Sequence, residues 1–255
     1  MIIPLNTIFI AVVIGVSSGI VGSFIILKRM ALVGDALSHV ALPGIALMLA
    51  YHLDPFWGVL SFLLGAAVIV WWLESKTALP SEVLVGLLFT ASLAIGILTI
   101  PDTEVLESLF GTFPALTTVE SFLILGGGVG VTILAILLTR RFLFTIVSPE
   151  LSQVEYKGKA WKYDLVLLLI FSFVVALGIK LVGTLLMGAL TIIPASIAKN
   201  ITHSMSAFMV ASGFLGAFIA VFGVLIGQYF GFLPGPAIIL SGIGLFLVSL
   251  FLIRK

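Results

Sequence analysis

Long apolar runs separated by short polar segments fill the chain from one end to the other. The runs are close to the length of about 20 residues that an α-helix needs to cross a lipid bilayer. We predict about nine membrane-spanning helices, with eight to ten possible, at residues 5–27, 31–51, 56–73, 83–100, 119–139, 164–179, 181–197, 206–228 and 236–253. The runs at 164–179 and 181–197 are the shortest, which favours a tilted pair or one span followed by a half-helix.

Two of these spans carry glycines four residues apart, Gly15 with Gly19 and Gly126 with Gly130. Small residues at this spacing allow helices to approach each other closely within a membrane. We therefore expect both pairs to lie at tight contacts between helices.

Positively charged side chains occupy every second connecting segment. Lys and Arg are absent between Lys76 and Arg140, and the loop inside that interval is acidic. Because basic segments tend to stay in the cytoplasm, this alternation predicts an external N-terminus, a cytoplasmic C-terminus and an odd number of spans. Lys180 is the exception, because it lies at a predicted external turn.

The composition excludes several classes of protein. Hydrophobic residues make up 61% of the chain and charged residues only 9%, with a net charge of +1, whereas a soluble domain has about 25% charged residues. A water-soluble globular protein, a nucleic-acid binder and a disordered chain are therefore excluded. The absence of cysteine rules out disulfides and thiolate metal sites. We expect an all-α, polytopic protein whose residues 1–255 form a single transmembrane domain.

One group of ionisable residues lies inside a predicted span. Asp35 and His39 are four residues apart in the second span, so their side chains share a helix face, with Ser38 beside them. Charges within spans are costly and are candidates for function. A carboxylate and an imidazole form a partial ligand set for zinc or manganese. Two ligands leave the site incomplete, but a homodimer with this face on its axis would supply four.

The same pair has an alternative interpretation, which is a hydrogen bond between Asp35 and His39 that stabilises the start of the helix. Pro43 and Gly44 follow and predict an interruption of this helix. Such breaks often line a path through a membrane protein, although a proline in a span is also found as a simple packing kink. Ser38 and Pro43 are therefore candidates for a transport pathway.

The longest predicted cytoplasmic segment contains a short helix. Ser148 is placed to cap it, Pro149 occupies its first position, Glu150 lies in its first turn, and Gly158 can end it. This pattern predicts a two-turn helix within 148–158. It is either a docking element for a partner protein or a surface helix that rests at the membrane interface.

Two stretches resemble the hallmarks of the zinc/manganese ABC transporter permeases. The first is residues 27–39, Leu-Lys-Arg-Met-Ala-Leu-Val-Gly-Asp-Ala-Leu-Ser-His, followed by Leu-Pro-Gly at 42–44. The second is residues 182–195, from Val-Gly-Thr-Leu-Leu to Ile-Ile-Pro-Ala. The segment 148–158 lies where that family carries its coupling helix, and the order and spacing match over essentially the whole chain.

The resemblance implies the permease subunit of an ATP-driven metal importer in a prokaryotic plasma (inner) membrane. Such a permease would form a homodimer, bind two cytoplasmic ATP-binding subunits and receive its ion from an extracytoplasmic metal-binding protein. Asp35 and His39 would contact the transported zinc or manganese ion, ATP would bind the partner subunit, and no cofactor would be held permanently. The coupling helix would dock the ATPase through Pro149, Glu150, Val154, Glu155 and Gly158.

Other functions are less well supported by the residues. Iron or a metal chelate could pass through the same architecture, but a chelate needs no protein ligands such as Asp35 and His39. An ion-coupled secondary transporter without an ATPase would show inverted repeats and midplane charges, and neither is evident. An intramembrane enzyme is disfavoured because no catalytic motif is present. The pair Gly158-Lys159 lacks the rest of a phosphate-binding loop, so we expect no ATP hydrolysis by this chain alone.

Overall fold

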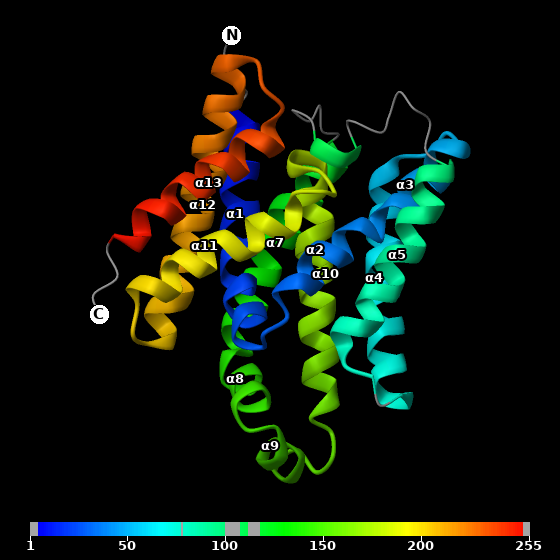
Figure 1. Ribbon diagram of the computed structural model, residues 1–255, viewed down its shortest axis with the longest axis vertical. Coiled ribbons are helices and arrows are strands. Elements are labelled where there is room, and N and C mark those ends of the chain that lie inside the picture. Colours follow the sequence, from blue (N-terminus) through cyan, green and yellow to red (C-terminus); the bar gives the residue numbers. More distant parts are fainter. Residues whose placement is uncertain (1–4, 78, 100–107, 112–117, 252–255) are drawn as a thin grey trace.

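The computed structural model describes residues 5–77, 79–99, 108–111 and 118–251. Within these ranges the regular structure is entirely α-helical, as the sequence predicts (Figure 1). The helices are α1 (Leu5–Leu27), α2 (Ala31–His39), α3 (Ala41–Ala50), α4 (Pro55–Lys76), α5 (Ser81–Thr99), α7 (Thr118–Leu137), α8 (Thr139–Val147), α9 (Pro149–Glu155), α10 (Trp161–Val182), α11 (Met187–Ile201), α12 (Met205–Phe230) and α13 (Pro234–Leu250). The predicted acidic loop with Asp102, Glu104 and Glu107 lies outside the described residues.

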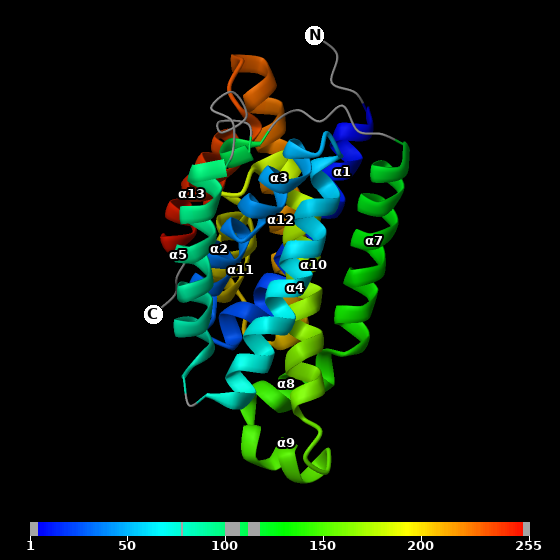
Figure 2. The same ribbon diagram turned by 90° about the vertical axis from the view of Figure 1, so that its right-hand side faces the viewer.

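The described helices make nine apolar passes through the molecule. Seven passes are long and apolar enough to cross a membrane, and α2 and α3 together form one of them. The other two, α11 and α13, are apolar but shorter, at 15 and 17 residues. Successive passes run in opposite directions, from α1, which begins at the end far from α9, to α13 (Figures 1 and 2). The predicted number of about nine spans agrees with this arrangement.

Helix α10 is longer than the span predicted at 164–179. It has 22 residues and continues through charged residues at both ends. Asp164 in its first turn accepts a hydrogen bond from Lys28 Nζ at 2.7 Å, and Lys180 in its last turn forms an ion pair with Glu120 of α7. Because both charges have partners, the helix continues beyond its apolar run. Lys180 is therefore part of a helix, and the prediction that placed it at a turn is wrong.

The second predicted span is interrupted, as expected, but the interruption lies at Val40, three residues before Pro43. Helix α2 ends at His39, Val40 forms a turn, and α3 begins at Ala41. Proline at position 43 has no N–H to donate to the carbonyl of residue 39, and its ring crowds that carbonyl. Pro43 itself lies in the first turn of α3, where backbone N–H groups need no partner within the helix. The proline thus ends α2 directly after its histidine.

Helix α8 has no counterpart in the sequence prediction, which extended the fifth span to residue 139. Helix α7 ends at Leu137, and α8 then continues to Val147 with Arg140 and Arg141 exposed and Phe142 buried. Its two faces therefore differ sharply in polarity, as expected of a helix at an interface. Helices α8 and α9 project beyond the other helices at one end of the molecule (Figure 1).

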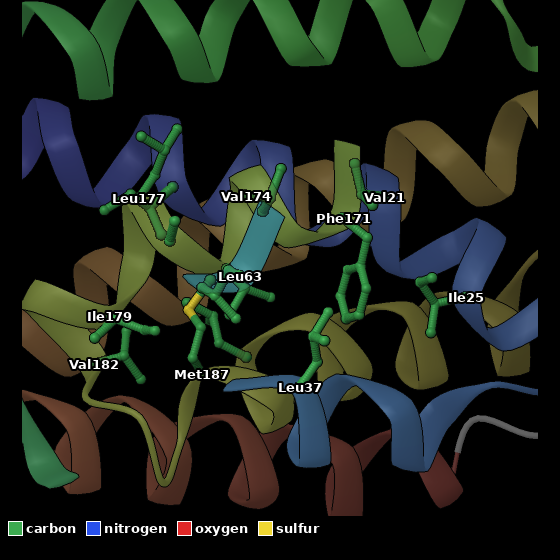
Figure 3. Close-up of a cluster of buried hydrophobic side chains, with 14 of the residues drawn as sticks. Val21, Ile25, Leu37, Leu63, Phe171, Val174, Leu177, Ile179, Val182 and Met187 are labelled. Carbon is green, nitrogen blue, oxygen red and sulfur yellow. The ribbon is translucent and has the colours of Figure 1, made fainter. Parts of the chain in front are cut away.

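Helix α10 lies at the centre and packs against α1, α2, α4 and α7. Figure 3 shows part of this core, in which Leu37 of α2, Leu63 of α4 and Met187 of α11 surround Phe171 and Val174. Helices α2, α5, α11 and α13 lie together on one side of the molecule, and α7 lies on the opposite side (Figure 2). One charged helix, α2, is therefore held at the edge of an apolar core.

Gly15 and Gly19 lie at a tight contact between helices, as predicted, whereas Gly126 and Gly130 do not. A methyl group at Gly19 would lie 2.6 Å from the carbonyl carbon of Ser212, and one at Gly15 would overlap the backbone of Gly216, so α1 and α12 are in direct backbone contact. A methyl group at Gly126 or Gly130 would meet nothing within 4 Å. The spacing is the same in both pairs, but the second pair faces away from the neighbouring helices.

Candidate ion site and docking helix

Helix α2 is positioned by three neighbours at the edge of the molecule. It packs against α5, α10 and α11, and its apolar side, including Val33 and Leu37, is buried in the core. Its remaining surface carries Asp35 and Leu32, both exposed in this single chain. The sequence folds this way because Val33 and Leu37 recur at helical spacing on the buried side of α2.

Asp35 and His39 lie one turn apart on α2 but in different environments. The carboxylate is exposed, whereas the imidazole is only 4% exposed and packs edge-on against the Phe89 ring of α5, with 5.0 Å between ring centroids. The Nδ1 atom of His39 is buried and has no hydrogen-bond partner among the described residues. Among the residues that the structure describes, no hydrogen bond or ion pair joins Asp35 to His39. The alternative interpretation, a local hydrogen bond at the helix start, is not supported.

Ser38 lies beside this pair, but its hydroxyl group is already engaged. It is fully buried, and Oγ donates to the backbone carbonyl of Asp35 at 2.7 Å. Its observed contact is therefore with the α2 backbone, which it fixes next to Asp35. Pro43 is buried one turn beyond His39, where it ends α2. Ser38 and Pro43, the two pathway candidates, thus lie next to Asp35 and His39. Ser38 binds the α2 backbone, and Pro43 ends the helix.

The donor set can bind a metal ion only in part. Among the described residues, no three His, Cys, Asp or Glu side chains gather in one place. A carboxylate oxygen and an imidazole nitrogen are ligands that both zinc and manganese accept. One chain therefore provides two ligands, and further ligands must come from another copy, from the incoming group or from water.

The predicted short helix is α9, and most of its expected features are present. Pro149 occupies its first position and Glu150 its first turn. Its last residue is Glu155, and Gly158 adopts a left-handed conformation (φ +74°) while its N–H donates to the Gln153 carbonyl at 2.7 Å. The backbone is left-handed first at Lys157 (φ +50°) and then at Gly158, and this bond provides a partner for a carbonyl in the last turn of α9.

The expected Ser148 cap is the exception. Ser148 stands at the cap position, but its side chain makes no capping hydrogen bond. Its own carbonyl accepts from Ser152 N at 2.9 Å, while the Ser152 hydroxyl donates to the Pro149 carbonyl at 2.7 Å. The prediction that the Ser148 side chain caps α9 is wrong.

The end of the molecule that carries α9 presents apolar side chains to its surroundings. Val147, Leu151 and Val154 are all largely exposed, and Val154 most of all, at 77%. Glu150 and Glu155 are exposed beside them. An exposed apolar group on a short projecting helix, rimmed by acidic residues, is typical of an interaction surface.

Other ionisable residues stabilise the fold. Asp54 accepts a hydrogen bond from Phe56 N at 2.9 Å and so caps α4. His52 is exposed, in a left-handed turn. Lys28 and Asp164 join the end of α1 to the start of α10. Phe89 could not be predicted as the neighbour of His39 from the sequence, because α5 and α2 are brought together only by tertiary packing.

Comparison with known proteins agrees with this architecture. The profile of the ABC 3 transport family matches residues 3–253. The manganese import system permease protein ScaB of Streptococcus parasanguinis is 34% identical over 255 residues, which cover 98% of this chain and 90% of ScaB. The high-affinity zinc uptake system membrane protein ZnuB of Haemophilus influenzae is 28% identical over 248 residues, or 94% of each chain.

A solved structure is similar over the same length. The structure of PsaBC from Streptococcus pneumoniae in complex with Fab superposes with a TM-score of 0.85 and 32% identity. The match covers 98% of this chain and 91% of the other. The similarity therefore includes the ion-site helix α2, the projecting helix α9 and every apolar pass between them.

Proposed function

The chain belongs to the ABC 3 transport family, and from this premise we propose that it is the membrane permease of an ATP-driven importer of manganese or zinc ions. One observation carries the proposal. The imidazole of His39 is buried without a partner for Nδ1, one helical turn from the exposed carboxylate of Asp35. Buried polar atoms normally have a partner, and a divalent cation would provide one for this pair. Similar proteins named for manganese import and for zinc uptake support both ions.

A second copy of the chain would complete the site. Asp35 is exposed on α2, and so is Leu32, at 75%, one turn before it. An exposed carboxylate on an apolar pass is costly unless protein or water covers it. A two-fold axis beside this face would bring two carboxylates and two imidazoles together, which suffices for a four-coordinate ion. Ser38 and Pro43 fix the backbone around these ligands and so form the adjoining part of the pathway.

The energy would come from separate ATP-binding subunits that dock on α9. Pro149, Glu150, Val154, Glu155 and Gly158 lie on or directly after this helix, outside the apolar passes, and all five are exposed. Burial of Val154 and its apolar neighbours would provide affinity, and the acidic rim would provide orientation. An extracytoplasmic metal-binding protein would deliver the ion at the opposite end, where α1 begins.

The bare ion is a better cargo than a metal chelate for a chemical reason. A chelated ion already has its ligands, so it gains nothing from a carboxylate and an imidazole. A free manganese or zinc ion exchanges water for these two groups and must leave again, which favours a site of modest affinity.

The test is uptake by the reconstituted transporter. The permease, its ATPase and its binding protein are placed in liposomes, and uptake of radioactive manganese or zinc is measured with and without ATP. Asp35→Asn and His39→Ala should each reduce uptake to the level seen without ATP, while the complex still assembles. Normal uptake by both variants, or ATP-independent uptake by the permease alone, would overturn the proposal.

A further inference from the structure

The backbone of α2 at Asp35 is in direct contact with the backbone of α11. A methyl group placed on Gly188 would lie 2.6 Å from both Cα and N of Asp35, and 2.9 Å from the carbonyl carbon of Gly34. Real side-chain carbons do not approach backbone atoms so closely. Only glycine at position 188 therefore allows α11 to lie where it does against the residue that carries the carboxylate.

Backbone conformation does not explain this glycine. Gly188 lies in the first turn of α11 and is not one of the described glycines with positive φ. In a helix, glycine is less favourable than alanine by roughly 0.5–1 kcal/mol. The benefit of glycine at position 188 must therefore come from the close approach to Asp35.

A second contact holds the same point of α2 from α10. A methyl group on Gly34 would lie 3.0 Å from Cζ of Phe171, whose side chain is fully buried. Leu37, one turn further along α2, points toward the same ring (Figure 3). The same methyl group on Gly34 would lie 3.8 Å from Cα of Gly188, so the backbone of Gly34 and Asp35 packs against both the Phe171 ring of α10 and Gly188 of α11.

We propose that Gly188 and Phe171 are positioning residues for the ion site, and that their contacts with residues 34 and 35 set the distance of the Asp35 carboxylate from the ion. The inference rests on the proposed function of the Asp35–His39 pair. His39 is held independently, at the other end of α2, by its packing against Phe89. A displacement of α2 at residue 35 would therefore tilt the helix about His39 and move the Asp35 carboxylate relative to the ion more than it moves the imidazole. Groups that orient metal ligands typically contribute about 10- to 100-fold to metal affinity.

The test compares three glycine-to-alanine variants in the full-length permease. Gly188→Ala places a methyl group against Asp35. Gly19→Ala creates a clash of similar closeness between α1 and α12, neither of which carries the pair, and Gly244→Ala adds a methyl group that meets nothing within 4 Å. Binding of Mn²⁺ to the purified protein is followed through the loss of the electron paramagnetic resonance signal of the free ion. Thermal unfolding is measured on the same samples.

Gly188→Ala should weaken Mn²⁺ binding by about 10- to 100-fold. Gly19→Ala should lower the unfolding temperature but leave the affinity of the folded protein within about twofold of the wild type, because its clash touches no ligand helix. Gly244→Ala should change neither quantity. Wild-type affinity in Gly188→Ala would overturn the inference, as would an equal loss of affinity in Gly19→Ala.

If Gly188→Ala does not fold, a second variant tests whether contacts with the backbone of residues 34 and 35 position the Asp35 carboxylate. Gly34→Ala places a methyl group 3.0 Å from the far end of the Phe171 side chain and at an ordinary contact distance, 3.8 Å, from Cα of Gly188, so the clash is mild. It should weaken Mn²⁺ binding, and the shorter side chain in Gly34→Ala with Phe171→Leu should restore it. Wild-type affinity in Gly34→Ala alone, or no recovery in the double variant, would refute the positioning role. Failure of the wild-type protein itself to bind Mn²⁺ would instead count against the proposed function.

Discussion

At the scale of single residues, His39 is the group of the candidate site at which protons can compete with the ion. Imidazole binds metal only in its neutral form, and its unperturbed pKa is about 6.5. A proton and the cation therefore compete for the same group. The competition predicts a dependence of transport on pH that the carboxylate alone would not give near neutrality.

We expect half-saturation of uptake to require more metal as the pH at the ion site falls from about 7.5 to about 5.5, because an increasing fraction of His39 is protonated. The measurement is the concentration dependence of manganese uptake in liposomes at a series of pH values. His39→Gln should be weak throughout and should lose most of this dependence, whereas Asp35→Asn should be weak but keep it. An unchanged pH profile in His39→Gln would assign the titration to another group.

The sequence predicted the candidate ligand pair but not its environment. The spacing of four residues is enough to place Asp35 and His39 on one side of a helix. It cannot tell that Ser38 turns inward to the Asp35 carbonyl, or that Phe89 covers the imidazole. Those contacts depend on α5, α10 and α11, which only tertiary packing brings to α2.

At the scale of helices, charged residues at the ends caused most of the errors in the predicted bounds. A window of hydropathy ends a span at the first charges, so it stopped α10 at 164–179. In the structure the charged residues just outside this range, Lys162 and Lys180, both lie within α10, and Lys180 is paired with Glu120. Helix α8 was missed for the same reason, since the predicted span ended before Arg140 and Arg141, which lie in the first turn of α8.

The short helix α9, the proposed docking helix, was predicted as a helix because its signals are local. Pro149 begins it, and the left-handed Gly158 follows its end. Val154 then stands as its most exposed apolar side chain, at 77%. Burial of a valine side chain contributes roughly 1.5–3 kcal/mol, so this residue is the natural target for a test of docking.

Val154→Asp should weaken association with the ATPase by at least about tenfold, because each 1.4 kcal/mol corresponds to one factor of ten. Co-purification of the two subunits and metal-dependent ATP hydrolysis are the measurements. Gln153→Asp is the matched control, since it puts the same charge on the adjacent exposed residue and should keep association near the wild-type level. Normal association in Val154→Asp would move the docking surface away from α9.

At the scale of the whole molecule, close helix contacts are distributed unevenly. Helices α1 and α12 touch through Gly15, Gly19 and the backbone around Ser212 and Gly216, while Gly126 and Gly130 of α7 face open space. The sequence pattern is identical in the two cases. Which glycines are used depends on the rotation of each helix about its axis, and that rotation follows from the packing of the complete bundle. Sequence spacing alone therefore could not separate them.

Orientation in the membrane is a property of the entire chain, and its charges predict it. Lys76, Lys157 and Lys199 belong to the basic segments at the end of the molecule that carries α9. The one exception, Lys180 at the opposite end, forms an ion pair with Glu120, so its charge is compensated locally. With that exception explained, the excess of positive charge predicts that α9 lies in the cytoplasm.

Cysteine labelling in intact cells tests this orientation without background, because the chain has no cysteine of its own. His52→Cys lies in the exposed turn between α3 and α4, and Lys157→Cys lies just after α9 at the other end. A membrane-impermeant maleimide should label His52→Cys, whereas Lys157→Cys should react only after the cells are permeabilised. Both replaced residues are exposed, so a difference in labelling reports the side of the membrane rather than burial. Labelling of Lys157→Cys in intact cells, with protection of His52→Cys, would reverse the topology and place α9 out of reach of a cytoplasmic ATPase.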